Sequence, residues 1–213
     1  MKLTLSNQTC YLLAEKAVYW EEQKTLIVAD IHIGKETVFR KAGIPIPGRI
    51  MEDDLLQITH LIHKWKAEKC IIVGDLIHAQ SGMTSSVKNK VSTWLKEIPC
   101  PCHLILGNHD QPLIKNLPSD WSLHLHTEGL LVEPFYFSHY PMHHEQWFVW
   151  AGHLHPKVEI SNGYDRLVLR CFQIFSDLAI LPAFGFFVGG ALVKKSRGCR
   201  IFAIAHDTVI EIK

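Results

Sequence analysis

Five short apolar runs in this 213-residue chain end at an aspartate, an asparagine or a histidine. The clearest of them, residues 102–106, reaches Gly107 and is followed at once by Asn108, His109 and Asp110. A buried strand that ends in a turn of polar side chains is typical of open α/β sheets, which bind ligands at the carboxyl ends of their strands. The other four runs end at Asp30 and His32, at Asp75, at His139, and at His153 and His155. The pattern predicts that these strand ends meet at one place.

Each motif has an ordinary structural explanation when it is taken alone. An aspartate at a strand end often caps a turn, an Asn-Gly pair often forms one, and a lone histidine is often a loop residue. Seven such residues in order, each set after an apolar run, favour a shared site over coincidence.

The spacing of apolar residues predicts a chain that begins with strands and then alternates helix and strand. Strands are expected at 10–13, 17–21 and 25–29. Helices at 35–42, 50–66 and 85–97 alternate with strands at 70–73 and 102–106, which favours a parallel central sheet. After residue 120 we expect short antiparallel strands at 121–126, 129–132, 135–138, 147–151, 157–160, 166–174, 178–181, 199–205 and 209–212. Two sheets packed face to face with helices outside accommodate both halves in one domain, residues 1–213.

Composition excludes several classes of protein. Hydrophobic residues make up 47% and charged residues 20%, as in ordinary soluble domains, and the net charge of +1 gives no whole-chain attraction to nucleic acid or membrane. The most apolar segment, 178–193, is interrupted by Pro182 and three glycines, so no membrane helix is expected, and the first nine residues do not resemble a signal peptide. The six cysteines lack C-x-x-C spacing, which predicts reduced thiols and a cytoplasmic protein.

The residues at the strand ends form a set with metal-ligand chemistry. The seven are Asp30, His32, Asp75, Asn108, His139, His153 and His155. Nitrogen and oxygen ligands without cysteine suit manganese, iron or zinc, with manganese favoured. Seven ligands are too many for one catalytic ion but fit two divalent ions about 3.5–4 Å apart that share a carboxylate. Side chains alternate along an extended segment, so Asp30 and His32 are expected on one side of it.

These motifs in order (D-x-H, G-D, G-N-H-D, H and G-H-x-H) resemble those of the calcineurin-like metallophosphoesterases. Longer segments resemble the bacterial DNA-ligase-associated metallophosphoesterase group over residues 10–212. They are D-I-H-I-G-K at 30–35, F-R-K-A-G-I-P-I-P at 39–47, G-D-L-I-H-A at 74–79 and L-P-A-F-G at 181–185 with Gly189 and Gly190. The resemblance implies a four-layer αββα sandwich of two mixed sheets flanked by helices, a dinuclear site, and a phosphodiesterase linked to DNA ligase or helicase enzymes.

The resemblance also implies a role for each matching residue. It assigns Asp30, His32 and His155 to the first metal and Asn108, His139 and His153 to the second, with Asp75 as the bridge. It makes His109 the general acid or phosphate contact and Asp110 the partner that orients it. One departure from the group is the pair His143 and His144 shortly after His139. We keep His139 as the ligand because it directly follows the apolar run 135–137.

Three further residues are candidates for substrate binding. His78 follows Asp75 in the same loop, where it could contact substrate or simply pack. Lys35 and Arg40 could line a groove for a phosphate backbone, or belong to a solvated face beside a proline-rich loop.

The leading hypothesis is a dinuclear metal-dependent phosphodiesterase or nuclease in DNA repair, which uses in-line attack by a metal-bridging hydroxide. The alternatives are a phosphomonoesterase acting on nucleotides or phosphoproteins, and a binding module that keeps this fold without catalysis. The sequence does not determine the native metal, the physiological substrate or the oligomeric state. It also leaves open whether the enzyme is an endonuclease, an exonuclease or a small-molecule diesterase.

Overall fold

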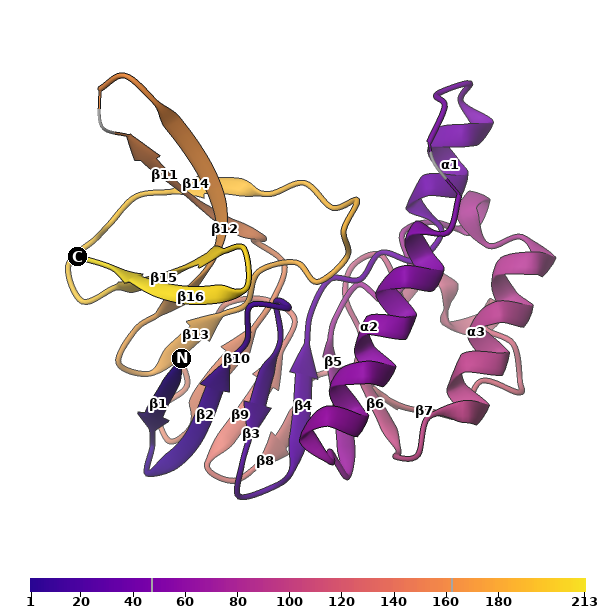
Figure 1. Cartoon of the computed structure of the whole chain (residues 1–213). Coiled ribbons are helices and arrows are strands. Elements are labelled where there is room, and N and C mark those ends of the chain that lie inside the picture. The colour runs from indigo at the N-terminus through magenta and orange to yellow at the C-terminus, as the bar shows by residue number, and fades with distance from the viewer. Residues whose placement is uncertain (47, 162) are drawn as a thin grey trace.

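Two mixed β-sheets pack against each other in the computed structural model, which describes residues 1–46, 48–161 and 163–213 (Figure 1). The predicted fold class, two mixed sheets flanked by helices, is confirmed. Pro47, the last residue of the segment 39–47 quoted above, lies outside the described residues.

The first sheet has an antiparallel half and a parallel half. Its strands, in spatial order, are β1 (Lys2–Leu5), β2 (Gln8–Leu12), β3 (Val18–Trp20), β4 (Thr25–Val28), β5 (Lys69–Val73), β6 (Cys102–Ile105) and β7 (Leu123–His126). Strands β1 to β4 run antiparallel and β4 to β7 run parallel. The parallel arrangement of β4, β5 and β6 was predicted, whereas β7, which was expected among the antiparallel strands, pairs in parallel with β6. Strand β1 was not predicted.

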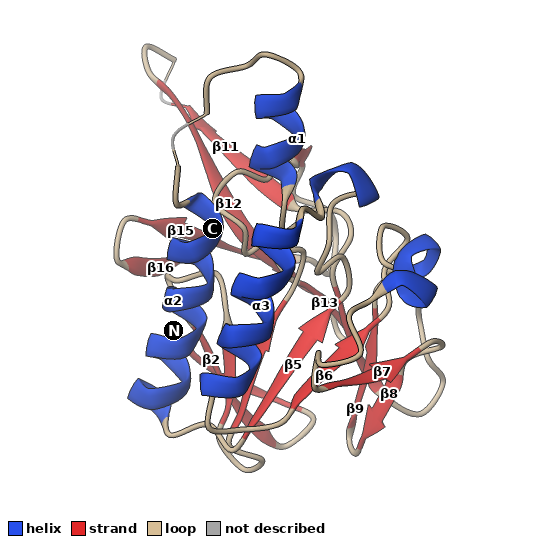
Figure 2. Ribbon diagram, turned by 90° about the vertical axis from the view of Figure 1, so that its right-hand side faces the viewer, coloured by secondary structure: helices blue, strands red, loops and turns tan. Residues whose placement is uncertain are grey.

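The helices connect the parallel strands and cover the outer face of this sheet. They are α1 (Lys35–Lys41), α2 (Ile50–Trp65) and α3 (Ser85–Glu97), with short 3₁₀ helices η1 (Gln80–Gly82) and η2 (Gln111–Asn116). Helix α2 buries Leu55, Ile58 and Leu61 at helical spacing, and Thr84 caps α3 by accepting a hydrogen bond from the Val87 amide at 3.3 Å. Figure 2 shows α2 and α3 side by side in front of the strands.

The second sheet is not the antiparallel array that the sequence predicted. Its strands are β8 (Leu130–Val132), β9 (Phe135–Ser138), β10 (Phe148–Ala151), β11 (Pro156–Ser161), β12 (Arg166–Ile174), β13 (Leu178–Ile180), β14 (Ala191–Val193), β15 (Arg200–Ala205) and β16 (Thr208–Ile212). Strand β10 pairs in parallel with both β9 and β13, and β14 pairs in parallel with β11. The prediction was wrong because alternation of apolar residues marks a strand but carries no information on its direction.

Aromatic side chains fill the space between the sheets. Trp20 of the first sheet packs on Phe135 of the second with ring centroids 4.6 Å apart, and Phe137, Trp150 and Phe172 complete this core. All five side chains are fully buried. Because β9 and β10 run parallel, their carboxyl ends reach the same edge of the sandwich as the ends of β4, β5 and β6.

The six cysteines are free and buried, as expected. Within the described ranges, no helix combines the length and the apolar character needed to cross a membrane.

Candidate metal centre

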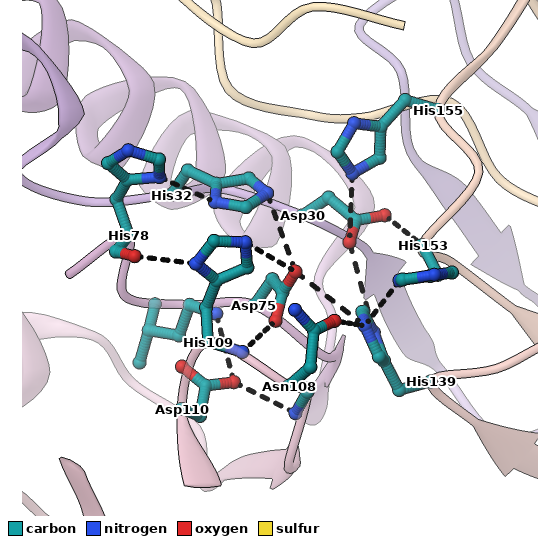
Figure 3. Close-up of polar contacts among 12 residues, drawn as sticks. Asp30, His32, Asp75, His78, Asn108, His109, Asp110, His139, His153 and His155 are labelled. Atoms are coloured by element: carbon teal, nitrogen blue, oxygen red, sulfur yellow. Dashed lines mark hydrogen bonds and ion pairs between the residues drawn. The ribbon is translucent and has the colours of Figure 1, made fainter. Parts of the chain in front are cut away.

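The ends of five strands bring the seven predicted ligands to one edge of the sandwich (Figure 3). Five of them adopt a left-handed backbone: Asp30 (φ 55°), His32 (φ 55°), Asp75 (φ 47°), His153 (φ 68°) and His155 (φ 47°). This conformation costs a non-glycine residue roughly 1–2 kcal/mol, and such strain clusters at functional sites. The prediction that the D-x-H segment is extended is therefore wrong. Asp30 and His32 face a common point because the backbone turns sharply at both residues, not because side chains alternate along a strand.

The first group of ligand atoms comes from Asp30, His32 and His155, whose atoms lie within 4.8 Å of one another. Asp30 Oδ1 lies 3.3 Å from His155 Nε2. Among the described residues, Asp30 Oδ1, His32 Nε2 and His155 Nε2 are buried and make no well-directed hydrogen bond. Buried polar atoms without partners are rare in folded proteins, and three that converge fit a bound cation.

The second group contains Asp75, His139 and His153, again within 4.8 Å. His139 Nε2 lies 3.0 Å from Asn108 Oδ1 and 3.1 Å from His153 Nδ1. Gly74 makes this approach feasible, since a Cβ atom there would lie 1.9 Å from the His139 ring. Two imidazoles, a carboxylate and an amide oxygen again form a set that suits a divalent transition metal.

Asp75 lies between the two groups. Its Oδ2 is 3.6 Å from His32 Nε2 and 3.6 Å from His139 Nε2, so one oxygen faces a histidine of each group. Its Oδ1 accepts a hydrogen bond from the His109 amide at 3.0 Å. The amide fixes the carboxylate with Oδ2 directed between the groups, which is the arrangement that a bridging ligand requires.

Burial controls the protonation of these residues. It lowers the pKa of His32 to about 2 and that of His139 to about 4, so both imidazoles are neutral near pH 7 and keep a free lone pair. Burial also raises the pKa of Asp30 and of Asp75, and the proximity of Asp30 raises that of Asp75 further. Two buried carboxylates this close require positive charge nearby, and metal ions supply it.

His109 is held by the backbone of its neighbour His78. Its Nδ1–H donates to the His78 carbonyl at 2.6 Å, which leaves Nε2 4.0 Å from Asp75 Oδ2. The His78 ring in turn places Nδ1 3.3 Å from His32 Nδ1. If His32 binds a metal through Nε2, its Nδ1–H donates to His78, an arrangement that fixes the orientation of a metal-binding histidine.

The predicted contact between Asp110 and the His109 imidazole is replaced by backbone contacts. Asp110 Oδ2 accepts hydrogen bonds from the amides of Leu76 and Gly107 at 3.2 and 3.0 Å, and Oδ1 accepts one from Ile77 at 2.9 Å. Asp110 thus connects the loop after β5 to the loop after β6. The His78 carbonyl, not Asp110, orients the His109 imidazole. The sequence placed the two residues side by side, but the turn directs their side chains apart.

The predicted substrate-binding residues divide into two near the centre and one away from it. Lys35 lines a small cavity together with His32, and its charge contributes to lowering the pKa of His32 and of His78. Arg40 Nη2 contacts Thr37 at 3.3 Å and Glu36 at 3.8 Å on its own helix, and it lines a separate cavity of about 490 Å³ with Lys90.

The two extra histidines of the 140–147 loop lie outside both ligand groups. His143 Nδ1 lies 2.6 Å from Asp177 Oδ2, and the His144 ring packs on Tyr136 at 5.4 Å. The geometry therefore favours His139 as the ligand from this segment, as the sequence predicted.

Sequence reasoning missed three residues that contact the centre or the loop packed against it. Asp54 lies on the buried face of α2, and Arg170 interrupts an apolar run in β12. In both cases the available signal was a charged residue at a position where the pattern predicts an apolar one. Tyr140 packs edge-on against His139 and His153, with ring centroids 4.9 and 4.7 Å away, and it remains 46% exposed.

A family model and one solved structure agree with this geometry. A family model described as calcineurin-like phosphoesterase matches residues 23–197. A nuclease from Pseudomonas putida, called MPE, has a solved structure that is 32% identical and covers 100% of this chain and 99% of that chain, with a TM-score of 0.86. A protein of unknown function from Aquifex aeolicus shares 17% identity over 55% of this chain and 60% of that chain, with a TM-score of 0.39. No curated protein sequence matches the chain.

Proposed function

The chain belongs to the calcineurin-like phosphoesterase family and is a metal-dependent phosphoric ester hydrolase, and from that premise we propose that it is a phosphodiesterase that cleaves nucleic acid. The observation that carries the proposal is the position of Asp75 Oδ2, 3.6 Å from a histidine of each ligand group. In the proposal, Asp30, His32 and His155 form the first metal position, and Asn108, His139 and His153 form the second. Asp75 belongs to both.

Two divalent ions held in this way would polarise the phosphate ester and provide a nucleophile at neutral pH. The residues of the chain orient the reaction. Because the His109 Nδ1–H is committed to the His78 carbonyl, Nε2 is the atom left to face the phosphate. When His109 is protonated, its Nε2–H can stabilise charge on the phosphate or give a proton to the leaving oxygen. Lys35 adds a positive charge beside His32 that favours an anionic substrate.

The finer parts of the proposal concern the substrate, the metal and the cellular role. The full-length similarity to a bacterial nuclease favours a nucleic-acid diester over a monoester. Manganese is favoured by the nitrogen and oxygen ligand set. We extend the proposal to a role in DNA repair, to association with a DNA ligase or helicase, and to a single domain in the cytoplasm, on the strength of the sequence resemblance and the reduced cysteines.

A paired assay tests the proposal. Metal-stripped protein is refilled with manganese and given either bis-p-nitrophenyl phosphate, a diester, or p-nitrophenyl phosphate, a monoester, with His109→Ala as the control for contaminating activity. We expect preference for the diester, followed by cleavage of DNA oligonucleotides. Preference for the monoester would replace the proposal with a phosphatase, and no turnover on either substrate with two metals bound would favour a binding module.

A further inference from the structure

Arg170 of β12 is a half-buried cation that binds one short segment of backbone. Its Nη1 donates hydrogen bonds to the carbonyl oxygens of Ala183 and Gly185 at 2.5 and 2.8 Å, and its Nη2 donates to those of Phe186 and Val188 at 2.8 and 2.9 Å. One guanidinium therefore holds four carbonyl groups of residues 183–188, a segment we call the clamped loop. A planar group with several fixed donors is suited to this task in a way that lysine is not.

Asp54 of α2 binds the same loop. The Phe186 amide donates to Asp54 Oδ1 and Oδ2 at 3.1 and 3.0 Å. Asp54 is 6% exposed, and it is a counter-charge near Arg170. The clamped loop is thus fixed to a helix of the first sheet and to a strand of the second, through the buried Asp54 and the half-buried Arg170.

The clamped loop packs directly on the segment that carries the first metal ligands. The amides of Phe184 and Gly185 donate to the carbonyls of Ala29 and Asp30 at 2.8 and 3.3 Å. A Cβ atom on Gly185 would lie 2.2 Å from the Ile31 carbonyl oxygen, so the two backbones are in close contact. Phe184 itself is fully buried.

This contact matters because Asp30 and His32 have left-handed backbone conformations, with φ of 55° at each. A strained backbone of this kind persists only where the surrounding structure holds it in place. Strand β4 ends at Val28, so the clamped loop is one of the neighbours that can hold residues 29–31.

We propose that Arg170 is a positioning residue for the first metal position: together with Asp54 it presses the clamped loop onto residues 29–31 and so sets the aim of Asp30 and His32. The inference rests on the metal centre of the proposed function, and it goes beyond that function by predicting that the two metal positions respond differently to one distant side chain. The second position takes Asn108, His139 and His153 from other strand ends, and among the described residues no hydrogen bond joins these three to the clamped loop.

Loss of groups that orient metal ligands typically lowers metal affinity 10–100-fold. We therefore expect Arg170→Met to raise the dissociation constant of the first position by roughly 10–100-fold and that of the second by less than about 3-fold. Arg170→Lys, which keeps the charge but cannot reach four carbonyls in one plane, should give a smaller change at the same position. Asp54→Asn should also act on the first position alone.

The experiment is a calorimetric titration of the metal-free chain with manganese. His155→Ala and His153→Ala identify which binding step belongs to the first and the second position. Arg166→Met is the matched control, since Arg166 lies on the same strand but is exposed and paired with Glu159 at 2.5 Å. Far-UV circular dichroism of each variant checks that it is folded, and Arg170→Lys and Asp54→Asn provide milder changes if Arg170→Met does not fold.

A selective loss at the first position in the Arg170 and Asp54 variants, absent from Arg166→Met, is the expected result. Equal weakening of both positions, or no weakening in any folded variant, would overturn the inference. Failure of the proposed function is visible separately: a wild-type chain that binds two ions without hydrolysing a diester refutes the function and leaves the inference standing.

Discussion

Two histidine clusters stand out among the described residues, and of these two only one has the features of a metal centre. The second cluster lies on neighbouring strands of the first sheet, with His103 on β6 and His124 and His126 on β7. His103 Nδ1 lies 3.0 Å from His126 Nε2, and the His103 ring stacks on those of His124 and His126 at 4.7 and 5.3 Å. We call this group the edge cluster.

The edge cluster differs from the metal centre in its charges and in its unpaired atoms. The neighbours that lower the pKa of His103 are His124, His126 and Lys69, with no carboxylate among them, whereas Asp30 and Asp75 lie among the imidazoles of the centre. Within the described residues, the unpartnered buried imidazole nitrogens belong to His32, His139 and His155, and none belongs to the edge cluster. The number of histidines therefore does not define a metal site; carboxylates and unsatisfied buried atoms do.

The largest effect is expected from the carboxylate that faces both ligand groups. Asp75→Asn should remove both ions together and lower diester hydrolysis by about 10³-fold or more, because the metals supply several kcal/mol of charge stabilisation. The measurement is metal content by elemental analysis beside the rate on bis-p-nitrophenyl phosphate. His103→Asn, a change in the edge cluster, should leave both values unaltered. Retention of two ions by Asp75→Asn would show that Asp75 does not bridge.

The next effect separates proton transfer from metal binding. His109→Ala should keep two metals per chain but lose roughly 10²–10⁴-fold in turnover, the contribution typical of a general acid or base. The loss should be greatest for a diester with a poor leaving group, since such a group needs the proton most. Wild-type rates of the variant on that substrate would exclude the role. His143→Ala, in a loop outside both ligand groups, is the control.

A smaller effect is expected from the histidine that supports His32. Because His78 accepts from His32 Nδ1–H when His32 binds metal through Nε2, His78→Ala should weaken the first metal position by roughly 10–100-fold. His78→Asn, whose amide oxygen can accept the same hydrogen bond, should recover part of the affinity. Manganese titration measures both. Unchanged affinity in His78→Ala would make His78 a packing or substrate-contacting residue instead.

The smallest effect concerns the edge cluster and its response to acid. Burial, then the neighbouring histidines, lower the pKa of His103 to about 4, from a usual value of about 6.5. The unfolded chain therefore binds more protons between these values, and stability that is present above pH 6.5 is lost as the pH falls toward 4. The loss should stay below roughly 1 kcal/mol, because solvent screens a partly exposed group.

Chemical denaturation of the metal-free chain at pH 7 and pH 5 measures this contribution. In His103→Asn the free energy of unfolding should fall less between the two pH values than in the wild type. An identical fall in both would show that the edge cluster is not the source of the acid sensitivity.

Much of the molecule could be predicted from the sequence because each apolar run specifies both a strand and the polar residues at its end. The runs before Asp30, Asp75, Asn108, His139 and His153 are strands, and the sandwich brings their ends together. Local pattern was sufficient here since the carboxyl ends of parallel strands share one edge.

Features that depend on distant parts of the chain could not be predicted. The parallel pairing of β9 with β10 depends on how the 139–147 segment crosses between them, and alternation of apolar residues is the same in either direction. The turn after Gly107 aims Asp110 at backbone amides instead of His109, which sequence adjacency does not reveal. Arg170 acts on a loop that is 13 to 18 residues away in the sequence, through carbonyl groups that any residue could supply.

The most direct test of the dinuclear centre is a manganese titration of the metal-free chain followed by electron paramagnetic resonance. The geometry predicts two ions per chain and, at full loading, the spectrum of a magnetically coupled pair, because ions that share Asp75 would lie about 3.5–4 Å apart. Saturation at one ion, or two ions with the spectra of isolated manganese, would contradict a centre bridged by Asp75.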